Sequence, residues 1–151
     1  MILKNELDQI AQLINQGNSK TNTVSAKGIY WHLDHSLIIL INVSKMLLKS
    51  DSLDYTPSFN FKRSIIFAIN FIPRGKGKAP KSVYPPDNIS KEDLQKKLKE
   101  ANQLLNMIID LPPKSNFTHP LFGMLNLKQT IKFLNLHTEH HLKICRDINK
   151  R

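Results

Sequence analysis

The sequence predicts an all-α fold, a bundle of helices joined by long crossover connections. Apolar residues recur at intervals of three and four along several stretches, which is the period of an amphipathic helix. No stretch alternates convincingly with period two, as a half-buried strand does. The chain has 151 residues and is 40% hydrophobic, which is enough for one buried core. We therefore expect residues 1–151 to form a single domain.

The first two predicted helices differ in how much of their surface is apolar. Residues 2–16 carry one apolar stripe, and Gly17 follows them as a stop. Residues 25–49 begin at Ser25, a favourable N-cap residue, and are apolar nearly all round. Such a helix lies in the centre of a bundle or at a subunit interface. A homodimer is therefore expected.

The middle of the chain predicts a shorter helix and a long connection. Residues 59–71 carry the apolar set of a third helix, and Pro73 ends it. Residues 74–88 contain three prolines and form an irregular crossover. Connections of about 15 residues are uncommon, and they are usually functional or linking.

Two longer helices follow the crossover. Residues 90–110 start at Ser90, which with Asp93 forms a near capping box. The last helix covers residues 126–149, and Asn126 and Gln129 have capping-box spacing. The segment FTHPLFGML, just before this helix, is expected to be a loop.

The net charge of +10 raises the question of an acidic partner. The lysines are scattered, and arginine does not interleave with aromatic residues, so nucleic acid is not the expected ligand. The densest basic patch is a loop that does not fit the phosphate-loop pattern. A basic adaptor that uses this patch is one alternative function; its residues are Arg74, Lys76, Lys78 and Lys81.

Other features predict a cytoplasmic protein with no membrane partner. The N-terminal stretch has charges within an amphipathic helix and lacks a signal-peptide cleavage site. The longest apolar run is far too short to span a bilayer. The single cysteine, Cys145, excludes an internal disulfide and fits a reducing compartment.

Half of the six histidines lie in the run LNLHTEHHLKIC of the last helix. His137 and His141 are four residues apart, so they share a helix face and form a half-site for zinc, nickel or iron. Both lie on the apolar, core-facing stripe of this helix, where an unpartnered polar group is costly. A third ligand must come from elsewhere, and the other histidine pair, His32 and His35 in YWHLDHS, offers one.

In these motifs the chain resembles the DinB-like (YfiT-like) superfamily of metal-binding four-helix bundles. Ser25 lies seven residues before the His32-Leu33 pair, which resembles the superfamily's first ligand. The run HTEHH resembles its HxxxH motif. The loop HPLFG, followed by a helix with HHL, resembles one uncharacterised branch. The likeness covers residues 25–148.

The resemblance implies a DinB-like bundle with an extra N-terminal or short helix. It implies the metal ligands His32, His137 and His141, with His35 as the alternate first ligand, because some relatives carry a WxLxH pattern. Characterised members include thiol-dependent transferases and domains that bind the iron of sulfoxide synthases.

Three imidazoles leave a coordination position open, as in catalytic metal sites. The expected function is therefore that of a metal-dependent hydrolase or thiol transferase acting on an unidentified small molecule. His140 and His119 are candidates for groups beside the metal, whereas Asp34 and Glu139 are expected to be solvated charges. A non-catalytic bundle, structural or small-ligand-binding, is the other alternative.

Overall fold

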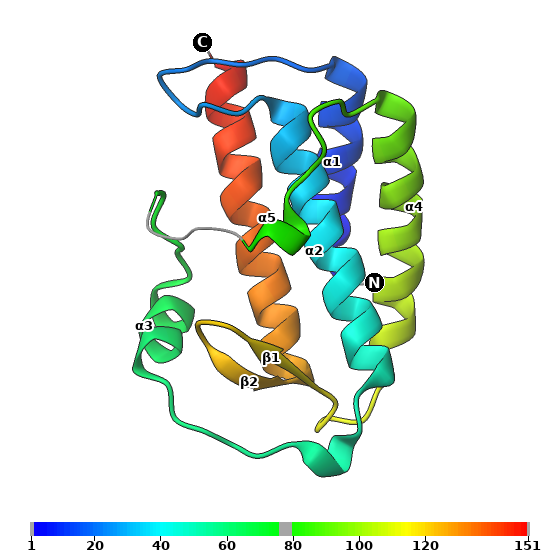
Figure 1. Cartoon of the computed structure of the whole chain (residues 1–151), viewed down its shortest axis with the longest axis vertical. Helices are drawn as coiled ribbons and strands as arrows, with labels where there is room; N and C mark the ends of the chain where they lie inside the picture. The colour runs from blue at the N-terminus through cyan, green and yellow to red at the C-terminus, as the bar shows by residue number, and fades with distance from the viewer. Residues whose placement is uncertain (1, 76–79, 151) are drawn as a thin grey trace.

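The computed structural model describes residues 2–75 and 80–150, and it is mostly helical (Figure 1). Within these residues it has five α-helices, two short 3-10 turns and one two-stranded sheet. None of these helices is both long and apolar enough to cross a membrane. The elements are α1 (Lys4–Gln16), α2 (Ile29–Lys49), η1 (Ser52–Asp54), α3 (Phe61–Ile69), η2 (Lys81–Val83), α4 (Lys91–Ile108), β1 (Asn116–His119), β2 (Gly123–Asn126) and α5 (Leu127–Asn149).

The long helices α1, α2, α4 and α5 pack side by side around one apolar core (Figure 1). Helix α2 contacts the other three, and Leu33, Leu37 and Leu40 on it are fully buried. Most of its apolar excess is therefore covered within the chain, although Met46 is 50% exposed. The homodimer, which was inferred from that excess, stays a prediction.

Helix α2 begins at Ile29, four residues later than expected. Its N-cap is Gly28, whose missing Cβ would lie 2.8 Å from Oδ1 of Asn18. The same oxygen accepts a hydrogen bond from the backbone N–H of Tyr30 at 3.0 Å. A side chain twelve residues before Tyr30 thus binds an N–H that would otherwise be unsatisfied at the helix start. Ser25 lies outside the helix and contributes to the site described below.

The predicted caps of the two later helices are confirmed. The hydroxyl of Ser90 accepts the N–H of Asp93 at the start of α4. At the start of α5, Asn126 and Gln129 form a complete capping box, in which each side chain accepts the other's backbone N–H. This box fixes the start of the helix that carries three of the histidines.

The expected loop before α5 is a β-hairpin instead. Strands β1 and β2 are antiparallel, and the buried Phe117 and Leu125 pair across them. Gly123, with a φ of 70°, begins the second strand in a conformation that other residues rarely adopt. Each strand has only four residues, which is too short for a period-two pattern to stand out in the sequence.

Helix α3 is shorter than expected and is turned outward. Asn60 caps its start, and Asn70, with a φ of 50°, ends it before Pro73 is reached. Its one buried residue is Arg63, which donates hydrogen bonds to backbone carbonyls of the β-hairpin. The apolar residues of this segment are largely exposed, with Phe61 at 67% and Ile69 at 57%. The apolar period predicted the helix correctly, but only part of its apolar set, Ile66 and Phe67, packs beside Arg63 against the core.

Candidate metal centre

Three histidines from two helices meet between α2 and α5. His35 lies on α2, and His137 and His141 lie one turn apart on α5. One ring nitrogen from each lies within 4.8 Å of the corresponding nitrogens of the other two. The ring centroids are 4.7 to 5.1 Å apart. These three histidines, the histidine cluster, are close enough to hold one metal ion.

The histidine that α2 contributes to this cluster is His35, the alternate expectation, rather than His32. Both nitrogens of His32 are engaged elsewhere: Nδ1 lies 3.0 Å from Nδ1 of His141, and Nε2 lies 2.9 Å from Oγ of Ser25. The Ser25–His32 spacing that suggested a ligand therefore corresponds to a direct hydrogen bond. The geometry favours His32 as a partner of a ligand.

A backbone carbonyl orients His35. Nδ1 of His35 lies 2.8 Å from the carbonyl oxygen of Val83, in η2. Because a carbonyl only accepts, Nδ1 carries the proton and donates it, which leaves a lone pair on Nε2. Outer partners of this kind commonly fix the tautomer of a metal-binding histidine. The ring of Trp31 stacks on the imidazole at 5.2 Å and limits its rotation.

His141 is oriented by a second chain of hydrogen bonds. Its Nδ1 is engaged with His32, so Nε2 is the nitrogen that remains for an ion. In that arrangement Nδ1–H of His141 donates to His32, and Nε2–H of His32 donates to the hydroxyl of Ser25. The backbone N–H of Lys27 also donates to this hydroxyl, at 3.1 Å, and holds it in place.

The chemistry of the cluster fits a metal ion. Nδ1 of His137 is buried and has no hydrogen-bond partner within the part of the chain that the structure describes. An unpartnered buried nitrogen is costly, and an ion at the cluster would give such a nitrogen a partner. Burial also lowers the pKa of His137 and His141 well below the usual value. Both are neutral at pH 7, which is the form that binds metals.

The pKa values of His35 and His32 are lowered as well. Burial is the main cause for His35, and the Val83 carbonyl and the nearby Asp34 carboxylate offset part of it. Burial, with a smaller effect of His35, lowers the pKa of His32 to about 4. All four rings of this region are thus held in the uncharged state near neutral pH.

The two further candidates lie in different surroundings. His140 borders the histidine cluster, since its ring centroid is 5.0 Å from that of His141 and its Nδ1 lies 3.0 Å from the carbonyl oxygen of Ile72. His119 does not join the cluster. Its Nδ1 accepts the backbone N–H groups of Leu121 and Phe122, at 3.0 and 3.2 Å.

Asp34 and Glu139 were expected to be solvated charges, but in the structure each of them forms an ion pair. Asp34 is fully buried, and one of its oxygens lies 2.5 Å from Nζ of Lys97. Glu139 pairs with Arg146, also at 2.5 Å. The prediction of a solvated Asp34 is therefore wrong: the sequence placed it correctly on α2 but did not show that α4 packs over it.

The basic patch is only partly described. Arg74 pairs with Asp147 of α5 at 2.7 Å, and Lys81 begins η2. Lys76 and Lys78 lie outside the described residues. The adaptor function therefore gains no structural support from this segment.

Two groups at the site were not predicted as part of it. Trp31 is four residues before His35 in YWHLDHS, so the helix period placed both on one stripe, but it did not indicate that the two rings stack. Val83 contributes only a backbone carbonyl from 48 residues further along the chain. No side-chain pattern marks such a contact.

Comparisons of this chain with protein-family models, curated proteins and solved structures find no match.

Proposed function

We propose that this protein binds one divalent metal ion through His35, His137 and His141 and leaves a coordination position open for a substrate. The observation that carries the proposal is the convergence of three neutral imidazoles from two helices within 4.8 Å. Zinc, nickel and iron are the candidates, since imidazole suits each of them.

We further propose that the chain is a DinB-like four-helix bundle. The support is the packing of four long helices, a ligand pair on the last of them, and a third histidine on α2 across the core. In chain order, helix α3 is then an insertion between α2 and α4, and the β-hairpin is one between α4 and α5 (Figure 1). A solved structure that resembled this chain and had another topology would argue against this assignment.

The proposed reaction class is hydrolysis or thiol transfer on a small molecule. A divalent ion at the cluster supplies Lewis acidity and lowers the pKa of a water or thiol that binds it. The protein keeps the ligands neutral by burial, and the Val83 carbonyl and His32 hold two of the rings in place. Trp31 covers the face of His35 and excludes water from it.

The metal content of protein purified without a histidine tag tests the proposal. We expect about one equivalent of metal in the wild type and its loss in His137→Ala. His119→Ala is the matched control, because it removes a partly buried histidine outside the cluster. Absence of metal in the wild type, even after incubation with zinc, nickel or ferrous iron, would favour a non-catalytic helical protein instead.

The homodimer and the cytoplasmic location are separate predictions. A monomer in light scattering at micromolar concentration would end the first.

A further inference from the structure

A second feature of α5 is a cavity on the side that faces the end of α3. It has a volume of about 320 Å³, at the small end of the range for ligand pockets. We call it the α5 pocket. The residues that line it are Asn70, Phe71, Ile72, Arg74, Lys132, Asn135, Leu136, Glu139, His140 and Lys143.

The wall of the α5 pocket is fixed by three local features. Asn70 adopts the left-handed conformation, with a φ of 50°, and turns the chain back after α3. The carbonyl oxygen of Ile72 then lies 3.0 Å from Nδ1 of His140, and Arg74 pairs with Asp147 at 2.7 Å. The segment is thus tied to α5 at two points, so the pocket is formed without a ligand.

The charges around the α5 pocket do not cancel. Its one acidic residue, Glu139, is already paired with Arg146. Among the described residues, Lys132 and Lys143 make no ion pair at all. Arg74 and Lys143 line the pocket together with His140. Arg74 pairs with Asp147, so Lys143 carries the unpaired charge at this end. This end of the pocket is electropositive.

Lys132 is too far away to share one small anion with Lys143. The two residues are 11 positions apart on α5, which corresponds to about 16 Å along the axis. Nζ of Lys132 lies 5.6 Å from the ring of Phe67 instead. An anionic group would therefore lie at the Arg74–Lys143 end, and the apolar side chains of Phe71 and Leu136 would contact the rest of the ligand.

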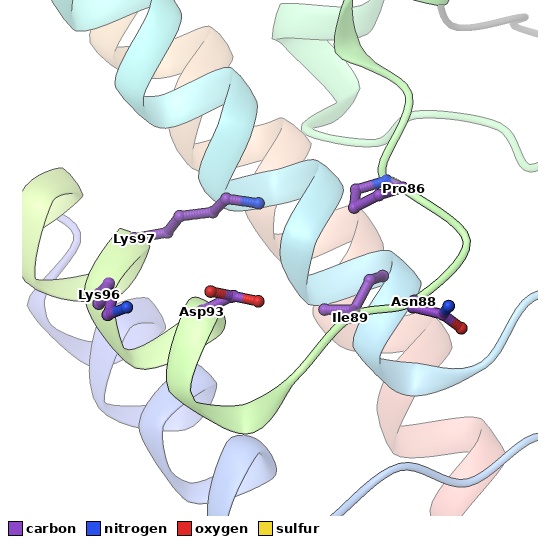
Figure 2. Close-up of a pocket in the computed structure, with 6 residues that line it drawn as sticks. All are labelled: Pro86, Asn88, Ile89, Asp93, Lys96 and Lys97. Carbon is purple, nitrogen blue, oxygen red and sulfur yellow. The ribbon is translucent and has the colours of Figure 1, made fainter.

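Another cavity shows the contrast (Figure 2). It has about 390 Å³ and lies between α4 and residues 86–89. Lys97 at its edge is neutralised by the buried Asp34, and Asp93 adds a negative charge beside Lys96. It therefore lacks the excess of positive charge that characterises the α5 pocket.

We propose that the α5 pocket binds a small molecule with a carboxylate or phosphate group and a short apolar body. This binding is separate from the proposed binding of metal and does not require a metal ion. It borders the histidine cluster, because His140 forms its wall and contacts His141 at a ring separation of 5.0 Å.

Calorimetric titration of chelator-treated protein at low salt tests this proposal. The probes are phenyl phosphate and benzoate, with benzamide as the neutral analogue of benzoate. We expect saturable binding of the two anions and none of benzamide. Lys143→Gln should weaken anion binding about tenfold, the loss of one charge-assisted hydrogen bond. Lys128→Gln, an exposed lysine on the same helix outside the pocket, is the matched control and should bind as the wild type does.

A second variant tests the apolar wall. Phe71 is 48% exposed, so Phe71→Ala is not expected to disturb folding. It should weaken binding of phenyl phosphate and leave that of inorganic phosphate unchanged.

Three results would overturn the proposal: benzamide binding as tightly as benzoate, equal weakening by Lys128→Gln and Lys143→Gln, or anion binding lost in His137→Ala and kept in Lys143→Gln. The last would place the anion at the histidine cluster. Because the titration is done without metal, a failed metal assay leaves its outcome unaffected.

Discussion

His119 and the histidine cluster both lie near α5, but the ring nitrogens of the two have different partners. His119 stacks on Phe122 at 4.5 Å, contacts Phe133 at 4.6 Å, and accepts two backbone N–H groups. In the histidine cluster, by contrast, one nitrogen from each ring lies within 4.8 Å of the corresponding nitrogens of the other two. The first arrangement stabilises a turn, and the second brings together three nitrogens from two helices.

Burial and pKa do not separate the two groups. Burial lowers the pKa of His119 to about 4, and it lowers the pKa of His137 and His141 as well. A lowered histidine pKa therefore indicates desolvation in either case. The position of the hydrogen-bond partners is what distinguishes a candidate metal ligand from a structural histidine.

The largest expected effect is on metal affinity. His141→Ala should weaken zinc binding by more than about a hundredfold, beyond the range for outer partners of a metal site. The reason is that it removes a direct ligand, whereas His119→Ala should bind zinc as the wild type does. Competition with a chromophoric chelator measures the zinc affinity of each variant. Equal affinities of His141→Ala and His119→Ala would contradict the distinction between a metal ligand and a structural histidine.

The next largest expected effect is on the stability of His119→Ala, the variant whose zinc affinity should not change. His119→Ala should lower the free energy of unfolding by about 2 kcal/mol, since it removes the acceptor of two N–H groups and a stacked ring. His119→Asn should recover part of this loss, because an amide oxygen can replace Nδ1 as acceptor. Urea unfolding of metal-free protein measures these differences. If His119→Ala had the same free energy of unfolding as the wild type, the ring would have no structural role.

The pH dependence of stability should report on His119 separately. Its pKa is about 4 in the folded protein and 6.5 in the unfolded reference, so the unfolded chain binds the extra proton between these values. The stability that His119 gains by staying neutral in the folded protein is therefore fully present above pH 6.5. It is lost as the pH falls toward 4, by at most about 1.4 kcal/mol per pH unit. The difference between the wild type and His119→Asn in urea midpoints should therefore shrink as the pH falls. A constant difference would contradict the assignment.

The smallest expected effect is that of Ser25, two steps from the proposed ion. Ser25→Ala removes the acceptor of Nε2–H of His32 and should weaken zinc binding by less than about tenfold. Ser64→Ala, which removes a hydroxyl bonded within α3, is a suitable control. A loss as large as that of His141→Ala would mean that Ser25 acts in a way other than through His32.

The sequence predicted the elements whose determinants are local. The period of apolar residues located all five helices, and cap residues such as Ser90 and Asn126 placed two of their starts. The spacing of His137 and His141 also placed them on one face, because the helix repeat alone decides it. These features depend on residues within a turn or two of one another.

The features that were missed depend on tertiary contacts. The start of α2 is set by Asn18, and the outward face of α3 follows from the burial of Arg63 against the β-hairpin. The sequence left His32 and His35 open as the third member of the cluster, because the two local patterns, the Ser25 spacing and WxLxH, pointed to different histidines. The packing of α2 against α5 brings His35 to His137 and His141, and the Val83 carbonyl binds its other nitrogen.

The most direct test of the central claim compares zinc affinity and stoichiometry in His35→Ala and His32→Ala. We predict that His35→Ala loses the site, because it removes a ligand. His32→Ala should keep one equivalent of zinc and bind it about ten- to a hundredfold more weakly, because it removes only the partner of His141. The reverse order, with the site lost in His32→Ala and kept in His35→Ala, would contradict the assignment of His35 as the third ligand.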